Sequence, residues 1–217
     1  GVLVYNNARA IERTIDKGMT SFILAQAGVP SPDTWVCESR DEAREIINRE
    51  TSTNQKLVLK PLFGNCGRGL QLLDSDSTLP DLEEVKGVYY LQKQIVSADQ
   101  KGRDWRVFVI GNQAIAAMER ISDHWITNRA KGGKCLPAVL TTEVRELAEA
   151  ASRAVDMNYA GVDIIRDAEG NYLVLEVNSV PAWRGLQSVI EKDIPQMLAD
   201  DLIALCHSSD RKPQIVR

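Results

Sequence analysis

The stretch from Gly161 to Asn178, GVDIIRDAEGNYLVLEVN, predicts a β-hairpin. Its first arm, Val162 to Arg166, is apolar and rich in β-branched residues. Asp167 to Gly170 carries the residues that tight turns favour, and Tyr172 to Val177 forms the returning arm. Residues on the outgoing strand are therefore expected to lie opposite residues on the return strand.

Three oxygen-bearing side chains occur in this hairpin, namely Asp163, Glu176 and Asn178. Glu176 and Asn178 are two positions apart, so a strand points both to the same face, and pairing can bring Asp163 opposite them. Two carboxylates and an amide oxygen suit Mg²⁺, which prefers oxygen ligands and shares its shell with substrate phosphates. The alternative, a strand whose charges face water, is disfavoured by the apolar residues around them.

The composition is that of an ordinary globular protein. The chain has 217 residues, 44% of them apolar and 26% charged, which is enough for one or two domains with a real core. A net charge of −4 argues against a nucleic-acid partner, and no stretch approaches the ~20 apolar residues of a membrane span. No signal peptide is evident, and the cysteines lack zinc spacing, so we expect a cytoplasmic protein with free thiols at Cys37, Cys66, Cys135 and Cys206.

Periodicity and turn residues predict an α+β fold in which antiparallel strand pairs are interleaved with helices. Helices are expected over 16–27, 39–49, 78–85, 141–157 and 194–206. Strands are expected over 33–37, 56–61, 88–95, 105–110 and 113–120, the last two joined by a tight turn at Gly111-Asn112. Residues 6–14 are expected to form a polar connector, and residues 122–136 an irregular segment.

A glycine-rich loop, GNCGRG from Gly64 to Gly69, lies between two predicted strands. Glycine allows backbone N–H groups to approach phosphate oxygens closely. This is not a P-loop, because no Lys-Ser/Thr pair follows and a strand rather than a helix comes next. Taken alone, the loop is equally consistent with a flexible hairpin tip. Lys60, in the apolar strand before it, favours the phosphate interpretation because a buried ammonium group needs an anionic partner.

Other polar residues downstream could complete a nucleotide site. The extended segment Tyr90 to Ile95 can offer backbone groups to an adenine edge, although by itself it is only a strand, and Asp104 could hold ribose hydroxyls. Arg106 and Arg120 lie on the two arms of one predicted hairpin. Together with Lys131 they could bind a carboxylate or stabilise a transferred phosphoryl group. Each cation taken singly is equally consistent with a surface charge.

The ordered series of these segments resembles ATP-grasp ligases and, within them, the RimK-type group of glutamate ligases. The matching segments are DKGMTSFILAQAGVPSPDT, LVLKP, the glycine loop, GRDWRVFVIGNQAIAAMER, ITNRAKGG, AGVDII and LEVNSVP, which run from about Asp16 to Gly185. The resemblance implies an ATP-grasp fold, in which two α+β subdomains clasp ATP. The expected division is a linker at 1–15, a small subdomain at 16–95, a C-terminal subdomain with the Mg²⁺ site at 96–207 and a flexible tail at 208–217. The N-terminal domain that relatives carry is expected to be absent from this chain.

The resemblance also implies roles for individual residues. ATP would be contacted by Lys60, Gly64, Gly67, Arg68, Gly69, Gln92, Lys93, Ile95, Asp104, Asn128 and Lys131. Arg106 and Arg120 would act on phosphate and acyl substrate, and Asp163, Glu176 and Asn178 would bind two Mg²⁺ ions, for which Mn²⁺ could substitute. The chain departs from many relatives at Lys93, where they carry an acidic residue. It also departs after Asn178, where Trp183 and Arg184 are expected to reshape the substrate end of the site. Arg184 could bind a carboxylate there or lie on the surface.

The activity that the resemblance implies is ATP- and Mg²⁺-dependent ligation of a carboxylate to an amine through an acyl phosphate. The amine would come from glutamate or a similar amino acid, and the carboxylate from a small molecule, cofactor or peptide. The alternative is an ATP-binding or regulatory module of the same fold without turnover. Neither nucleic acid nor membrane is an expected partner, and a homo-oligomer is possible.

Overall fold

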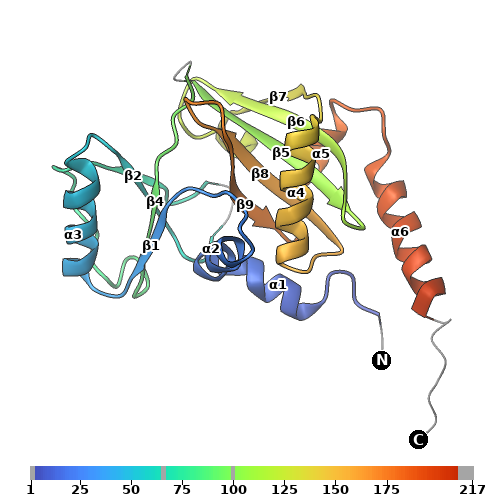
Figure 1. The fold of residues 1–217 in the computed structure, drawn as a ribbon, viewed down its shortest axis with the longest axis horizontal. Helices are drawn as coiled ribbons and strands as arrows, with labels where there is room; N and C mark the ends of the chain where they lie inside the picture. The colour runs from blue at the N-terminus through green and yellow to red at the C-terminus, as the bar shows by residue number, and fades with distance from the viewer. Residues whose placement is uncertain (1–2, 65–66, 99–100, 210–217) are drawn as a thin grey trace, which may run out of the picture.

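The computed structural model describes residues 3–64, 67–98 and 101–209 and contains two antiparallel sheets with helices packed on them (Figure 1). The helices are α1 (Ala8–Ile15), α2 (Lys17–Gln26), α3 (Arg40–Thr51), α4 (Thr142–Ala154), α5 (Arg184–Gln187) and α6 (Ile194–Ser209), with a 3₁₀ turn at Arg129–Lys131. The strands are β1 (Thr34–Cys37), β2 (Leu57–Lys60), β3 (Gln71–Leu73), β4 (Tyr89–Lys93), β5 (Gly102–Ile110), β6 (Gln113–Ser122), β7 (Lys134–Pro137), β8 (Tyr159–Arg166) and β9 (Tyr172–Asn178). The predicted α+β class is confirmed. Among the described residues, no helix has the length and apolarity that a membrane span requires.

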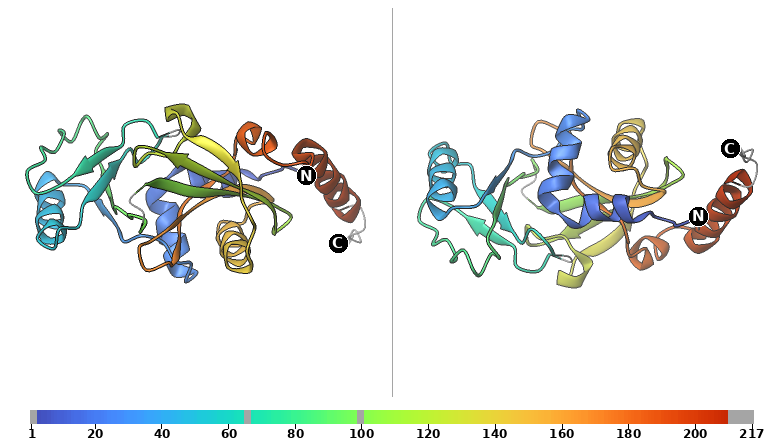
Figure 2. Two further views of the ribbon diagram at one scale, coloured as in Figure 1. Left: turned by 90° about the horizontal axis from the view of Figure 1, so that it is seen from above. Right: turned by 90° about the horizontal axis from the view of Figure 1, so that it is seen from below.

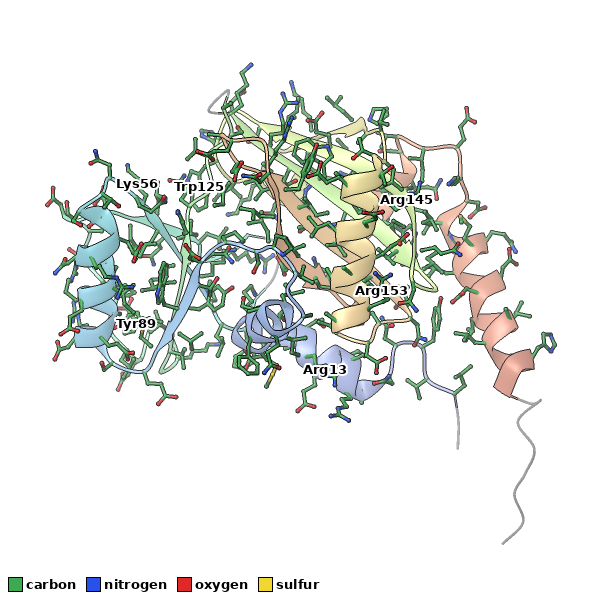
Figure 3. All side chains as sticks on the ribbon, viewed as in Figure 1. Arg13, Lys56, Tyr89, Trp125, Arg145 and Arg153 are labelled. Atoms are coloured by element: carbon green, nitrogen blue, oxygen red, sulfur yellow. The ribbon has the colours of Figure 1, made fainter. Side chains whose placement is uncertain are left out.

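The smaller sheet has the strand order β1-β4-β2-β3, and α3 covers one of its faces. The helix begins where the sequence predicts it, because the Ser39 hydroxyl accepts a hydrogen bond from the Glu42 backbone N–H at 3.2 Å. Ile47 of the helix and Leu57 of β2 are fully buried together with Tyr89, which lies beside α3 in Figure 3. This core holds β2 and β4, the strands that carry Lys60 and the predicted adenine segment.

The larger sheet has the order β7-β6-β5-β8-β9 and is covered on both faces. One face packs against α4, α1 and α2, and the other packs against α5 and α6. Seen from above, α4 and α5 lie on opposite sides of the sheet (Figure 2). Leu24 of α2 is 2% exposed and belongs to the core under α4, so this helix packs with the larger sheet.

Alternation along β5 directs successive side chains to the two faces of the larger sheet, and Asp104 and Arg106 share one face. Val107 and Val109 point into the core beneath α4. Asp104, Arg106 and Phe108 belong to the other face, where Phe108 packs against the α5–α6 side. The polar residues of that face lie toward the smaller sheet, which positions them for the site described below.

The N-terminal segment differs from expectation, because the predicted connector at residues 6–14 contains α1. The Asn7 side chain accepts a hydrogen bond from the Ala10 backbone N–H at 2.9 Å and caps the helix. Ala10 and Thr14, four positions apart, form its buried face. The cap residue and this spacing are the signals from which the helix could have been found.

The helix predicted at residues 78–85 is wrong. The segment consists of turns, in which the Glu84 N–H bonds the Asp81 carbonyl and the Lys86 N–H bonds the Glu83 carbonyl, each three residues back. Lys86 and Gly87 then adopt positive φ angles of 57° and 85°, which an α-helix does not contain. The polar spacing of this segment favours a helix, but its backbone N–H and carbonyl groups form the hydrogen bonds of tight turns instead.

The segment predicted to be irregular at residues 122–136 is more regular than expected. It contains the 3₁₀ turn and ends in β7, which pairs with β6 so that Cys135 lies opposite Arg120. A strand of four residues at a sheet edge shows too little alternation to be recognised from sequence. Asn65 and Cys66 of the predicted glycine loop, and positions 210–217 of the predicted tail, lie outside the described residues.

Candidate active site

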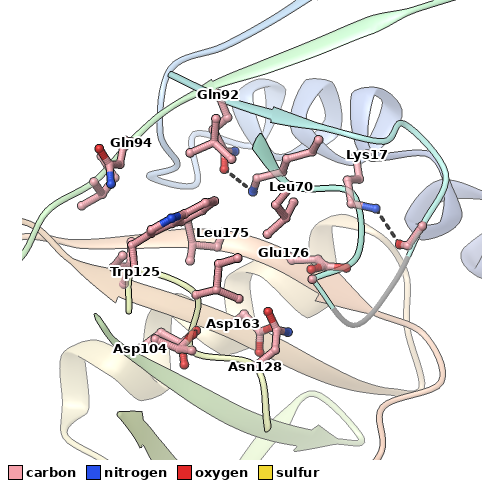
Figure 4. A pocket seen from close by; sticks show the side chains of 18 of the residues that line it. Lys17, Leu70, Gln92, Gln94, Asp104, Trp125, Asn128, Asp163, Leu175 and Glu176 are labelled. Carbon is pink, nitrogen blue, oxygen red and sulfur yellow. Dashed lines mark hydrogen bonds between the residues drawn. The ribbon is translucent and has the colours of Figure 1, made fainter. Parts of the chain in front are cut away.

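A cleft between the two sheets brings the predicted site residues together (Figure 4). It contains about 860 Å³ of space, part of it open to solvent. The smaller sheet and its loops contribute Val58, Lys60, Pro61, Gly64, Gly67, Arg68, Leu70, Gln92, Lys93, Gln94 and Ile95. The rest of the lining consists of Lys17, Asp104, Arg120, Trp125, Ile126, Thr127, Asn128, Asp163, Ile165, Leu175 and Glu176.

Lys60, at the end of β2, points into the cleft. Its ammonium group donates to the Gln92 side-chain carbonyl at 2.5 Å, and the Gln92 amide in turn donates to the Thr34 and Tyr90 hydroxyls. Burial lowers the pKa of Lys60 from 10.5 to about 8, while the carboxylate of Glu176 across the cleft acts in the opposite direction. The charged form of Lys60 therefore lacks full compensation, as expected of a group that receives an anion.

The glycine loop reaches from the smaller sheet to the opposite wall of the cleft. On one side the Lys17 ammonium group donates to the Gly64 carbonyl at 2.7 Å. On the other side Gly67 has a φ angle of +67°, and a Cβ added there would lie 2.5 Å from the Asn128 side-chain oxygen. Only glycine combines this backbone conformation with so close an approach. The hydrogen bond from Lys17 anchors one described end of the loop, and the other described end passes close to Asn128.

A row of buried and half-buried charges crosses the larger sheet along its wall of the cleft. Strand pairing places Arg120 of β6 opposite Asp104 of β5 and Arg106 of β5 opposite Asp163 of β8. It also places Asp163 opposite Glu176 of β9. These five side chains carry two positive and three negative formal charges. The row therefore has a net charge of −1 at the point where a cation is predicted.

The arginines of this row form forked contacts with the aspartates. Arg106 donates to both oxygens of Asp163, and Arg120 donates to both oxygens of Asp104 at 2.6 and 2.7 Å and to Asp163 at 3.1 Å. Thr127 also donates to Asp104. Burial raises the pKa of Asp163, but the two guanidinium groups outweigh this and hold the pKa below its ordinary value. In this arrangement, Asp104 holds the Arg120 guanidinium group in place.

Gly161 on β8 provides the room for one of these contacts. A Cβ at this position would lie 3.2 Å from Cδ of Arg106 and 2.6 Å from Cβ of Pro181. A side chain here would therefore displace the arginine from its path to Asp163.

A β-bulge in the hairpin determines which residues of β9 reach the cleft. Asp163 pairs with Glu176, whereas the next residue of β8, Ile164, pairs with Val174 and leaves Leu175 as the extra residue. Strict alternation would place Leu175 and Glu176 on opposite faces. The bulge allows both to line the cleft.

The three predicted metal ligands differ in how many of their oxygen acceptor sites are available to a Mg²⁺ ion. Glu176 points into the cleft, and burial together with the nearby Asp163 raises its pKa, as expected of a carboxylate without full compensation. Asn178 donates its amide N–H to the Gly161 carbonyl at 3.3 Å, which leaves its oxygen as a ligand. Asp163 uses three acceptor sites for arginine, and a carboxylate has about four, so one remains. The described residues contain no cluster of three His, Cys, Asp or Glu side chains able to hold a metal, so oxygen from Asn178 and from a phosphate would be needed.

Apolar side chains line part of the cleft and form a wall there. Trp125 is 37% exposed, and Figure 4 shows its ring projecting into the cleft beside Leu175. Figure 3 places the same residue where the two sheets approach each other. Leu70 and Ile95 complete this wall. A planar aromatic base would find a stacking surface here.

Most of the predicted residues line the cleft. Four do not, namely Gly69, Arg106, Lys131 and Asn178. Arg106 and Asn178 lie directly behind the lining, in contact with Asp163 and Gly161, whereas Lys131 lines a different cavity. Sequence reasoning did not find Lys17, Trp125, Thr127 or Leu175. Asp16-Lys17 begins α2, but nothing local separates this lysine from the surface lysines.

Two sheets that face each other across a cleft, with a lysine and a glycine loop on one wall and carboxylates on the other, are the arrangement of the ATP-grasp class of proteins. The chain belongs to the RimK-like ATP-grasp domain family, whose sequence profile matches residues 14–203.

Similar proteins of known name are ligases. A tetrahydromethanopterin:alpha-L-glutamate ligase of Methanococcus maripaludis is 36% identical over 93% of this chain and 70% of its own length. The alpha-aminoadipate–LysW ligase LysX of Saccharolobus solfataricus is 29% identical over 92% of this chain and 74% of its own. The structure of the ATP-grasp ligase PsnB, solved with a precursor variant, Mg and ADP, has a TM-score of 0.72 and 27% identity over 94% of this chain. The present chain spans 63% of that protein's length.

Proposed function

We propose that the protein is an ATP- and Mg²⁺-dependent carboxylate–amine ligase. The observation that carries this proposal is the position of Lys60 and the Asp163–Glu176 pair on facing walls of one cleft. A lysine on one side and carboxylates on the other suit a nucleotide polyphosphate with a bound divalent cation. Arg120, in contact with Asp163, adds a fixed positive charge close to where phosphoryl transfer would occur.

The proposed reaction has two steps. A substrate carboxylate oxygen attacks the γ-phosphorus of ATP, the bond to the β-phosphate oxygen breaks, and ADP leaves. The amine nitrogen of the second substrate then attacks the acyl carbon, phosphate leaves with the electrons of its C–O bond, and the amine loses a proton. The products are an amide, ADP and phosphate. No covalent intermediate with the protein is needed, so the residues act by positioning, charge and exclusion of water.

In this proposal the residues have separate tasks. Lys60 and the glycine loop hold the phosphates, Trp125 and Leu175 hold the base, and Arg106 and Arg120 fix the carboxylate row and the developing charge. Mg²⁺, proposed as two ions for which Mn²⁺ substitutes, would be held by Glu176, Asn178 and the remaining acceptor site of Asp163. When bound, it would neutralise phosphate charge. The roles of the other predicted contacts that line the cleft, including Lys93 and Asn128, remain part of the proposal, whereas Lys131 lines a different cavity.

The proposed amine substrate is glutamate or a similar amino acid, and the proposed acceptor is a carboxylate on a small molecule, cofactor or peptide. The names of the relatives support this, because they are ligases of glutamate or aminoadipate. The test combines the protein with Mg-ATP, glutamate and a cell extract of small molecules, and measures ADP together with products heavier by one glutamate residue. Thermal stabilisation by ATP without any ADP would support a binding module instead.

Nucleotide binding is expected to be coupled to proton uptake at Lys60. With a pKa of about 8 in the free protein, this lysine is largely neutral at about pH 8.5, and a bound phosphate restores its ordinary pKa. Between about half and one proton should therefore be taken up per ATP at about pH 8.5, and almost none at about pH 6.5. Titration calorimetry in two buffers of different ionisation enthalpy measures this number.

In the absence of ATP, Lys60 also makes the free energy of unfolding depend on pH. The sign of this dependence is opposite to that of a lysine whose pKa is raised by a salt bridge. Between about pH 8 and pH 10.5 the unfolded chain binds more protons at Lys60 than the folded chain does, so the free energy of unfolding rises with pH. Saturating ATP should remove this dependence on pH. Lys60→Met should abolish the proton uptake, and Lys56→Met, outside the cleft, should not change it. Equal uptake by wild type and Lys60→Met would show that another group is responsible.

Trp125 is expected to report and support nucleotide binding. Stacking of a base on an aromatic side chain contributes about 1–3 kcal/mol, so Trp125→Ala should weaken ATP binding by roughly 5- to 140-fold. Trp125→Phe should retain most of the affinity but lose the change in tryptophan fluorescence on adding ATP. Trp35, on the outer strand of the smaller sheet, provides the control, since Trp35→Phe should leave that signal intact. An unchanged fluorescence signal in Trp125→Phe would show that the base does not stack on Trp125.

A further inference from the structure

Lys60 is held by a hydrogen-bond network that continues behind the wall of the cleft. Its ammonium group donates to the Gln92 side-chain oxygen, an interaction drawn in Figure 4. The Gln92 amide group donates to the hydroxyl of Tyr90 at 3.3 Å, and this hydroxyl shares a hydrogen bond of 2.8 Å with that of Ser21. We propose that Tyr90 is a positioning residue for Lys60 and acts by fixing the side chain of Gln92. This inference rests on the proposed function, in which Lys60 binds the phosphates of ATP.

Strand pairing places the members of this network on one face of the smaller sheet. Lys60 of β2 lies directly opposite Tyr90 of β4, and Thr34 of β1 lies opposite Gln92 of β4. Positions 90 and 92 are two apart on one strand, so both side chains point to the same face. Gln92 lines the cleft, whereas Tyr90 is 2% exposed and is not among the residues that line it. Tyr90 therefore acts through its neighbours rather than by contact with a nucleotide.

The network determines which end of the Gln92 amide group faces the lysine. The two hydrogens of the NH₂ group go to the hydroxyls of Tyr90 and Thr34. The carbonyl oxygen is thereby turned toward Lys60, whose ammonium group can only donate. Burial raises the pKa of Tyr90, so its hydroxyl keeps the proton that it can donate to Ser21. Loss of this hydroxyl would leave a buried amide hydrogen without its acceptor.

A fixed amide group matters because the opposite wall of the cleft offers Lys60 a competing partner. The negative charge of Glu176 acts on Lys60 across the cleft and opposes the lowering of its pKa by burial. A lysine side chain is a flexible point charge that can turn toward such a carboxylate. An ion pair between these two residues would occupy both the proposed phosphate-binding group and the proposed metal ligand. The hydrogen bond to Gln92 keeps the ammonium group on its own wall, where a phosphate can reach it.

The hydroxyl of Tyr90 is itself anchored outside the smaller sheet. Ser21 belongs to α2, and the same helix carries Leu24, which is buried in the core under α4. The network therefore runs from a helix that packs with the larger sheet to the lysine of the smaller sheet. Through this connection, the position of Lys60 depends on how the two sheets are placed.

The test is a double-mutant cycle in which the binding of Mg-ATP is measured by titration calorimetry. Lys60→Met should weaken binding by about 10- to 100-fold, because hydrogen bonds between a charged group and the phosphates are lost. Tyr90→Phe keeps the ring, removes the hydroxyl and should weaken binding by about 3- to 10-fold. Added to Lys60→Met, the same change should have less than about a twofold further effect, since the residue through which it acts is gone.

The neighbouring tyrosine provides a matched control. Tyr89 lies on the other face of β4, in the core beneath α3, and its hydroxyl donates to the Pro80 carbonyl at 2.7 Å. Tyr89→Phe therefore removes one hydrogen bond from the same strand but has no connection to Lys60 through the network. It should leave the affinity for Mg-ATP within about twofold of that of the wild type.

Each outcome decides the inference. Weakening by Tyr90→Phe that disappears in the Lys60→Met background supports it. Equal weakening in both backgrounds would show that Tyr90 affects the nucleotide by another route. Unchanged binding in Tyr90→Phe, beside weakened binding in Lys60→Met, would overturn the inference but leave the proposed function intact. Wild-type affinity in Lys60→Met, or no binding of Mg-ATP by the wild type, would overturn both. If Tyr90→Phe does not fold, Ser21→Ala replaces it with an expected loss of at least about twofold, and no loss there counts against the inference.

Discussion

Glu176→Ala is expected to lower kcat/KM for ATP-dependent ligation by about 10³-fold, the largest effect predicted for any single side chain. Glu176 faces the cleft and accepts no hydrogen bond from the residues that the structure describes, whereas Asn178 and Asp163 are partly occupied. Charge neutralisation by a metal ion is worth several kcal/mol, and each 1.36 kcal/mol corresponds to about tenfold in rate. The measurement is ADP formation against Mg²⁺ concentration with glutamate and an acceptor identified by mass spectrometry.

The same substitution should leave stability unchanged or raise it. Burial and the nearby Asp163 raise the pKa of Glu176, so the ionised side chain is disfavoured in the folded protein and its removal relieves a cost. Glu169→Ala, in the exposed turn of the same hairpin, is the matched control and should change neither rate nor melting temperature. Full activity of Glu176→Ala would show that the metal is held elsewhere. Loss of activity accompanied by a lower melting temperature would show a structural role.

Asp104→Ala is expected to destabilise the protein by about 3–5 kcal/mol, because it leaves the buried Arg120 guanidinium group without a forked partner. Both side chains of this pair are only 5% exposed, so water cannot replace the lost carboxylate. For a chain of this length, about 2–4 °C of melting temperature corresponds to each kcal/mol, which predicts a decrease of about 6–20 °C. Calorimetry or circular dichroism at neutral pH measures the shift.

An exposed ion pair of similar length provides the control for this prediction. Arg40 and Asp81 lie 2.8 Å apart with side chains 49% and 74% exposed, so Asp81→Ala should cost no more than about 1 kcal/mol. Replacing both partners, as Asp104→Leu with Arg120→Met, should recover most of the lost stability, since no charge is then left unpaired. This double variant should remain inactive in the proposed reaction. Equal destabilisation by Asp104→Ala and Asp81→Ala would show that the charge row contributes little to folding.

Local signals in the sequence were sufficient for most of the fold. The caps at Asp16, Ser39 and Thr141 mark the first residues of α2, α3 and α4, and in each case a side-chain oxygen accepts a backbone N–H in the structure. Gly111 and Asn112, with φ angles of 56° and 63°, form the tight turn expected between β5 and β6. Where signals were short or contradictory, as in α1, β7 and residues 78–85, the prediction failed.

The candidate site was harder to predict, because its residues interact through space. Arg106 and Asp163 are 57 positions apart, and their contact depends on β5 pairing with β8, which no local pattern specifies. The bulge that turns Leu175 toward the cleft breaks the alternation on which strand predictions rest. Trp125 lies in a loop, where side-chain direction follows from packing rather than from periodicity.

By itself, the sequence determined the α+β class, the hairpin that places Glu176 and Asn178 on one face, and the nearness of Lys60 to a glycine loop. These features depend on residues that are neighbours along the chain, so spacing is enough to derive them. Only the tertiary structure decided that the two sheets face each other across one cleft, that arginines occupy most of Asp163, and that Lys131 lines a separate cavity. Those facts depend on how sheets pack and how buried charges find partners, which is settled by contacts between distant residues.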